Sequence, residues 1–206
     1  MRITEISSNP LFQLVAGHPA LDFVNTLDWR FRESGTEELL HTYGDLLRFT
    51  AQSQLLTPRQ AQQLQRAISN RTGARVLESS TKLRESLAQA FYAVLDGQSP
   101  SATTLGNLDR HFKAAHDNQK LSWNQPHFEW CLSGMESKAE LPLWLLALTT
   151  SDLMTGESMH LVRACDNPEC RWLFLDTSKN HTRRWCDMKL CGNRMKARRF
   201  KAREAY

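Results

Sequence analysis

The sequence lacks the long apolar segment that a membrane-spanning helix needs. No stretch of it reaches about eighteen consecutive apolar residues. Residues 1–5 also lack the basic region followed by a hydrophobic stretch that is typical of a signal peptide. We therefore expect a protein that stays in the cytoplasm, has no membrane partner and keeps its thiols reduced.

The sequence also lacks the short motifs of several enzyme classes. It has no phosphate-binding glycine loop, no nucleophile elbow and no metalloprotease helix. Internal repeats and low-complexity linkers are absent as well. Its 206 residues, 41% of them hydrophobic, suffice for one ordinary domain plus a small appendage. These absences favour a binding protein over an enzyme.

Cysteine is rare before the C-terminal segment. Only Cys131 lies there, and we expect it to be a small buried apolar residue. The other four form two pairs with four intervening residues each, and fifteen residues separate the pairs: Cys165 and Cys170, then Cys186 and Cys191. Two tight turns with this spacing can bring four thiolates to one zinc ion, each at about 2.3 Å. The spacing predicts one structural Zn²⁺ per chain.

Two other interpretations of the four cysteines stay open, a disulfide or redox switch and an iron–sulfur site. A shell of four thiolates leaves no position for a catalytic water, so the expected zinc is structural. Metal binding should supply much of the folding free energy of so small a module, on the order of 10 kcal/mol.

Positive charge is concentrated in the last quarter of the chain. Residues 160–206 carry 12 Lys and Arg against 5 Asp and Glu, whereas residues 1–159 have a net charge of −3. A predicted helix from Cys191 to about Glu204 holds six cations within ten residues: Arg194, Lys196, Arg198, Arg199, Lys201 and Arg203. This density favours phosphate groups, with nucleic acid as the leading class of partner. A solvated cationic tail is the alternative interpretation.

Apolar periodicity predicts a mainly α fold of the α+β kind. We expect helices over residues 20–30, from Thr36 through Phe49, from residue 57, over 76–95, from 101 through 112, and over 142–154. Residues 121–132 predict a β-hairpin around a turn at 124–126. Short strands on both sides of the first cysteine turn, followed by the basic helix, predict a treble-clef-like zinc module. The expected domains are residues 1–157 and 158–206.

Two segments resemble known families. Residues 185–194, which end in Cys191-Gly192-Asn193-Arg194, resemble the CGNR zinc finger, and the likeness extends back to residues 174–178. Residues 17–26 resemble the opening of the ABATE domain, which accompanies that finger in a family of stress-induced transcription regulators. The resemblance covers essentially the whole chain. It implies a DNA-binding zinc finger joined to a sensing domain that takes a small-molecule effector.

Two interpretations of the opening of the first domain stay open. His18, Asp22 and Asn25 either converge on a small-ligand pocket or tie down the loop before the helix and the helix ends. A homodimer is also expected, because one finger reads few base pairs. Its candidate interfaces are the helix over 142–154 and an exposed face of the first domain.

Together these features predict a zinc-dependent DNA-binding transcription regulator, responsive to stress. The alternatives are a zinc-stabilised module that binds RNA or acidic proteins, and a thiol-based redox sensor.

Overall fold

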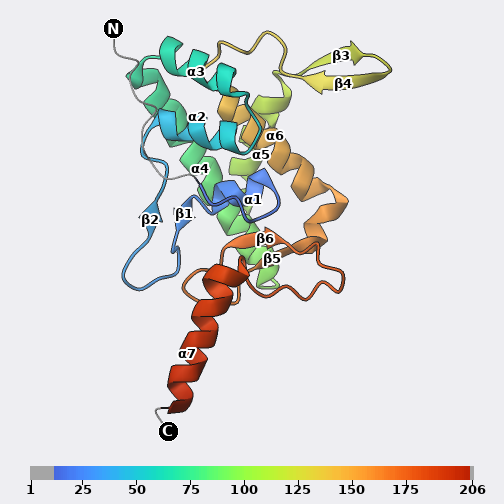
Figure 1. Cartoon of the computed structure of the whole chain (residues 1–206). Helices are drawn as coiled ribbons and strands as arrows, with labels where there is room; N and C mark the ends of the chain where they lie inside the picture. The colour runs from blue at the N-terminus through green and yellow to red at the C-terminus, as the bar shows by residue number, and fades with distance from the viewer. Residues whose placement is uncertain (1–11, 205–206) are drawn as a thin grey trace.

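The computed structural model describes residues 12–204, except the side chains of residue 199 and residues 201–204. The fold is mainly α-helical with three small two-stranded antiparallel sheets, which confirms the predicted class (Figure 1). The helices are α1 (Pro19–Val24), α2 (Tyr43–Gln52), α3 (Pro58–Ala67), α4 (Asn70–Leu95), α5 (Ala102–His116), α6 (Leu141–Thr155) and α7 (Asn193–Glu204). The strand pairs are β1 (Leu27–Asp28) with β2 (Glu37–Glu38), β3 (Lys120–Asn124) with β4 (His127–Cys131), and β5 (Val162–Ala164) with β6 (Leu173–Leu175).

Polar residues before the helices explain where several of them begin. Thr57 and Gln60 form a reciprocal capping box at the start of α3. The hydroxyl groups of Ser69 and Ser101 accept backbone N–H bonds at the starts of α4 and α5. Each cap satisfies an amide that has no partner within its helix. The predicted starts of α3 and α5 are therefore confirmed to within a residue or two. The helix expected over 76–95 begins six residues earlier, at Asn70, behind its Ser69 cap.

The first two predicted helices are wrong in extent. The helix expected over 20–30 ends at Val24, because Leu27 and Asp28 pair as β1 with β2. The helix expected from Thr36 begins only at Tyr43, where Thr42 and Asp45 form the capping box. Glu37 and Glu38 belong to strand β2 instead. This strand pairs with β1 across a loop, and the local sequence signals of a helix start give no information about such a pairing.

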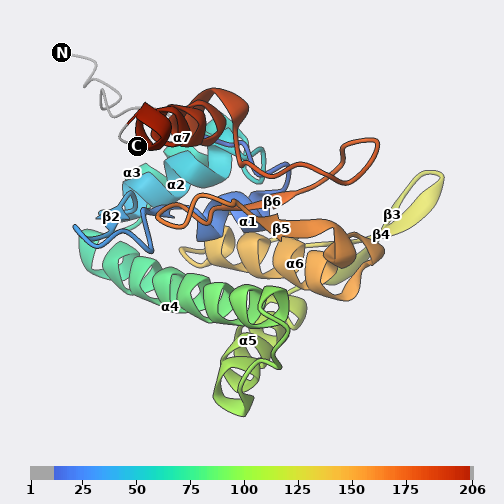
Figure 2. The same ribbon diagram turned by 90° about the horizontal axis from the view of Figure 1, so that it is seen from below.

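Helix α6 lies in the core of the protein. Leu146 and Ala147 are fully buried and Leu153 is only 3% exposed. The helix expected over 142–154 is thus confirmed, but its main apolar face packs against the neighbouring helices and is not a free dimer interface. Figure 2 shows α6 with α1 on one side of it and α4 on the other.

One apolar core runs through the residues before and after position 157. Leu173 and Phe174 of β6 are fully buried in the same cluster as Leu21 of α1. The side-chain amide of Asn25 joins the two parts, since it donates to the Leu173 carbonyl and accepts from the Leu173 amide, each at 2.9 Å. The Leu175 amide donates to the Ala16 carbonyl at 2.8 Å. The C-terminal segment is therefore built onto the helical part of the fold.

The hairpin β3–β4 stands out from this body. It confirms the predicted hairpin, with Leu121 opposite Trp130 and Trp123 opposite Phe128 (Figures 1 and 2). Cys131 at its end is only half-buried and lies 3.0 Å from the Ser122 hydroxyl, so the expectation of a buried Cys131 is wrong.

Within residues 12–204, no helix is long and apolar enough to cross a membrane.

The Asn25 bridge gives a first prediction. Asn25→Ala leaves both backbone groups of the buried Leu173 without that partner, so the free energy of unfolding should fall by about 3 kcal/mol in urea denaturation. Asn70→Ala, an exposed position in the first turn of α4, should stay within about 0.5 kcal/mol of the wild type. An Asn25→Ala protein as stable as this control would contradict the bridge.

Candidate metal centre

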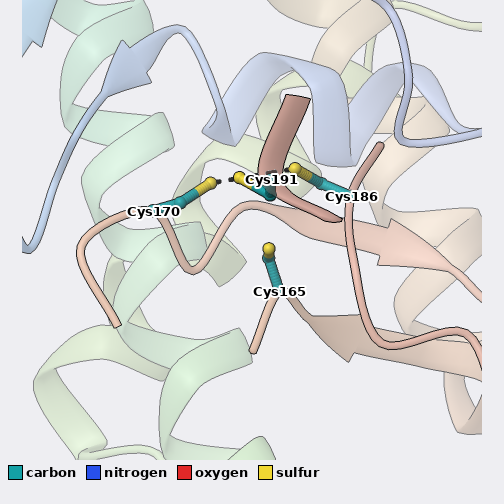
Figure 3. A group of neighbouring side chains, drawn as sticks. All are labelled: Cys165, Cys170, Cys186 and Cys191. Atoms are coloured by element: carbon teal, nitrogen blue, oxygen red, sulfur yellow. Dashed lines mark hydrogen bonds between the residues drawn. The ribbon is translucent and has the colours of Figure 1, made fainter. Parts of the chain in front are cut away.

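Four cysteine thiols converge at one buried point. The sulfur atoms of Cys165, Cys170, Cys186 and Cys191 all lie within 4.8 Å of one another. Each residue is at most 4% exposed. Figure 3 shows the four side chains pointing toward a common centre from separate stretches of the chain. The predicted ligand set is therefore assembled in space as well as in sequence.

The spacing of the sulfurs fits a tetrahedral metal ion. A zinc–sulfur bond of about 2.3 Å implies sulfur atoms about 3.8 Å apart at the corners of a tetrahedron. The Cys170 and Cys186 sulfurs are 3.8 Å apart. Four soft thiolates in a buried place form a donor set suited to zinc or to an iron–sulfur cluster. These residues could hold one metal ion.

The first cysteine pair lies on the turn between β5 and β6. The Cys165 amide donates to the Trp172 carbonyl at 2.9 Å, which extends the ladder of the strands by one step. The Asn167 carbonyl then accepts the amides of Cys170 and Arg171, each at 3.0 Å. Arg171 has a positive φ of 49°, which turns the chain back into β6. This tight turn places both sulfurs on the same side.

The second pair leads into the basic helix. Cys191 lies in a π-helical turn, η2 (Met188–Gly192), which continues directly into α7. The Asp187 carboxylate caps this turn by accepting the Leu190 amide at 2.9 Å. The last ligand therefore lies two residues before the first residue of α7. Any ion held by the four sulfurs fixes the start of that helix.

Two N–H groups point at the sulfurs. The buried side-chain amide of Asn167 donates to the Cys191 sulfur, and the Trp172 backbone amide donates to the Cys170 sulfur, each at 3.5 Å. Donors of this kind stabilise thiolate over thiol and orient metal ligands. Asn167 was not among the predicted site residues, although it is the amide side chain inside the first cysteine turn.

The close approach of the thiols also couples their ionisation. Hydrogen bonding with Cys165 lowers the pKa of Cys191 and raises the pKa of Cys170 far above its ordinary value. The four thiols thus do not ionise independently. A metal that binds all four must displace the protons that they share, so its affinity should fall at low pH.

A second polar network supports the cluster from the loop before Cys186. The buried Asp176 carboxylate accepts bonds from the hydroxyl and the amide of Ser178 and from the Arg183 amide. The bond from the Ser178 hydroxyl is the main cause that lowers the pKa of Asp176. The Arg183 guanidinium lies over the Phe174 ring at 4.3 Å and donates to the carbonyls of Val15 and Cys186. This arginine joins the cysteine loop to the N-terminal segment.

The cations of α7 have different environments. Arg194 lies over the Trp29 ring at 4.5 Å, and Arg198 donates to both Glu169 oxygens at 2.9 Å. Lys196 is exposed. The side chains of Arg199, Lys201 and Arg203 lie outside the described residues, although the helix backbone runs through all three positions. Sequence reasoning missed that Arg194 and Arg198 also contact the protein itself.

Comparison with protein families agrees with this architecture. A family model described as a CGNR zinc finger matches residues 162–204. A second model, ABATE, described as "Putative stress-induced transcription regulator", matches residues 17–157. The chain belongs to the ABATE family. No curated protein matches it.

The ABATE region and the CGNR finger meet at several side chains. Arg171 of the finger pairs with Asp96 at 2.7 Å and lies over the rings of Phe31 and Tyr92. The Tyr92 hydroxyl donates to the Arg171 carbonyl at 2.9 Å. The two matched ranges thus contact each other and contribute to one apolar core. The domain boundary expected at residue 157 stays a prediction.

The three residues predicted for an effector pocket all bind the chain itself. His18 caps α1 by accepting the Ala20 amide, Asp22 accepts the Ala16 amide at 3.0 Å, and Asn25 binds β6. These bonds agree with the second interpretation, in which the three residues hold the loop and the helix ends in place. The ligand pocket around them stays a prediction.

A cavity of about 340 Å³ lies elsewhere in the ABATE region, between α4 and α5. Lys82, Arg110 and His111 are among its lining residues, and none of the three predicted pocket residues is. Burial lowers the pKa of His111, and the nearby Arg110 lowers it further. The sequence pattern gave no signal for this cavity, because its walls come from two helices that meet only in the folded chain.

The Asn167 contact gives a second prediction. Asn167→Ala removes an N–H donor from the Cys191 sulfur, so affinity for Zn²⁺ or Co²⁺ in a chelator competition should fall about 10- to 100-fold. Asn180→Ala, an exposed amide in the loop before Cys186, serves as the matched control and should bind as the wild type does. Equal affinity in both variants would show that the amide does not support the cluster.

The Asp22 carboxyl gives a third prediction. Burial raises the pKa of Asp22 to about 6 in the folded protein, whereas the ordinary value of 3.8 applies to the unfolded chain. Between these two pH values the folded protein holds a proton that the unfolded chain has released. Stability from this group is therefore present at low pH and is lost as pH rises through about 6. From about pH 5 to about pH 7, the wild type should lose about 1 kcal/mol more unfolding free energy than Asp22→Asn. Urea denaturation at both pH values checks this, and identical pH dependence in the two proteins would contradict it.

Proposed function

We propose that this protein is a DNA-binding transcription regulator whose CGNR finger is folded by one structural Zn²⁺. The observation that carries the proposal is a basic helix that begins two residues after a cysteine of the cluster and projects away from the body (Figure 1). Such a helix, held at its start by a metal site, is a rigid element that can reach a nucleic-acid groove.

The choice of zinc follows from the ligands and their surroundings. Four thiolates in tetrahedral arrangement are the usual structural zinc shell, and a reducing cytoplasm keeps the thiols available. The bound ion would order the cysteine turns and the start of α7. Because the shell is closed, the proposed role is binding and not catalysis.

The helix presents two different cationic sides. Arg194 and Arg198 are four residues apart, share one side of α7 and contact Trp29 and Glu169. Lys196 and positions 199 and 203 share the opposite side of the helix backbone. We assign DNA phosphate contacts to Lys196, Arg199 and Arg203. The side chains of the Arg198–Glu169 pair are 47% and 35% exposed, and a solvent-accessible pair of this kind contributes little stability, so Arg198 can exchange it for a phosphate.

Response to stress belongs to the same proposal and rests on the description of the ABATE family. A redox-sensor role has less support, because oxidation selects exposed thiolates and these four residues are at most 4% exposed. Retained metal after mild peroxide treatment is the result that we expect. Reversible metal release would instead favour the redox sensor.

DNA binding across a salt series tests the proposal. If all six cations of the helix neutralise phosphates, affinity falls roughly as the fifth power of salt concentration, and the three assigned contacts account for about half of that dependence. The triple variant Lys196→Ala/Arg199→Ala/Arg203→Ala should make this dependence shallower by about three powers of salt concentration and weaken binding, measured by fluorescence anisotropy of a labelled duplex. Arg66→Ala, an exposed arginine on α3, should leave both unchanged.

The outcomes separate the alternatives. Cys186→Ser should lose both the metal and the DNA binding if the metal site holds the helix. If the triple variant binds duplex DNA as tightly as Arg66→Ala does, α7 is not the DNA-binding element. If single-stranded RNA displaces the duplex at lower concentration than unlabelled DNA does, the partner is RNA.

A further inference from the structure

The hairpin β3–β4 carries a large exposed apolar face. Leu121 and Trp130 form one cross-strand pair, and Trp123 and Phe128 form the next pair on the same face. Their exposed fractions are 56%, 64%, 53% and 66%, respectively. The rings of Trp123 and Phe128 are 4.6 Å apart. We call these four residues the hairpin face.

A hairpin with such a face is poorly suited to stand alone in water. A two-stranded hairpin is at best marginally stable unless its apolar face is covered. Figures 1 and 2 show β3 and β4 extending away from the helices, so the body does not cover the hairpin along its length. Contiguous exposed apolar surface of this kind usually marks an interaction site.

The charges on the hairpin argue against a nucleic acid or an acidic membrane as the partner. The two strands contain one lysine, Lys120, and one carboxylate, Glu129. Their charges cancel, whereas anionic lipids and nucleic acids select clusters of Lys and Arg. A neutral apolar face fits best against another neutral apolar face.

The area of the hairpin face fits a second copy of the chain. Large side chains of this kind bury about 150–250 Å² each, so at these exposed fractions one face offers roughly 500 Å². Two faces in contact would bury roughly 1,000 Å², which is the lower limit of a specific interface. We propose that two copies of this chain form a dimer by packing their hairpin faces together.

A two-fold arrangement of two hairpins is compatible with the positions of the two apolar pairs along each hairpin. In antiparallel packing, the pair near the tip, Trp123 and Phe128, lies against the pair near the base of the partner hairpin, Leu121 and Trp130. A cavity of about 490 Å³ at the base is lined by Trp130 and Leu148 and by three polar residues, His116, Gln119 and Asp152. It offers room for a ring from the tip of the partner hairpin. The same patch meets itself, as a two-fold interface requires.

Sedimentation velocity of the metal-loaded full chain tests the dimer without DNA, so its result is independent of the proposed DNA binding. The wild type should shift from monomer to dimer between about 1 and 100 µM. Trp123→Glu/Phe128→Glu places two carboxylates on the hairpin face and should weaken dimerisation at least tenfold. The matched control Asn124→Glu/His127→Glu adds the same charge to the opposite face of the hairpin and should dimerise as the wild type does.

Each outcome decides the proposal. Loss of the dimer in the first variant alone supports it, and the milder Trp130→Gln should also weaken the dimer at least tenfold. A wild type that stays monomeric up to about 100 µM overturns it. If that monomer binds vesicles of neutral phosphatidylcholine, the hairpin face binds lipid and not a second copy of the chain. A dimer that all three variants retain also overturns it, because another surface then forms the interface.

Discussion

The rest of this structure depends on the convergence of four cysteine sulfurs on one buried point. Two turns supply the sulfurs, and fifteen residues lie between the turns, yet all four atoms lie within 4.8 Å of one another. Buried thiols gain little from one another alone, whereas a shared metal ion turns the same geometry into a strong constraint on the chain. Because Cys191 leads directly into α7, that constraint also sets where the basic helix begins.

The finger is oriented by the ABATE region as well as by its own cysteines. Asn25 binds the backbone of β6, Trp29 lies against Arg194 of α7, and Tyr92 binds the turn of the first cysteine pair. Phe174 in the finger is fully buried in the common core. The ABATE region therefore contacts the finger directly, both at the first cysteine turn and at the start of α7. This gives the two matched families a physical reason to occur in one chain.

Local signals predicted a large part of this fold from the sequence. Thr57 and Ser101 precede helices that begin close to the expected places, because caps act within a few residues. The four cysteines were also identifiable, because metal spacing is a local pattern. The short β1–β2 pair displaced the predicted end of one helix and the predicted start of the next, because its paired residues are nine and eleven positions apart and meet only in the folded chain. The contact between Asn25 and Leu173 joins residues 148 positions apart, and no periodic pattern in the sequence indicates it.

X-ray absorption of zinc in the purified protein tests the central claim most directly. The account predicts one zinc per chain, with four sulfur neighbours at about 2.3 Å and no oxygen or nitrogen neighbour in the first shell. A spectrum with nitrogen or oxygen ligands, or a protein that carries no metal and whose four cysteines are paired as disulfides, would contradict it. In that case the start of α7 is not held by a metal site, and the proposed DNA-binding helix loses its support.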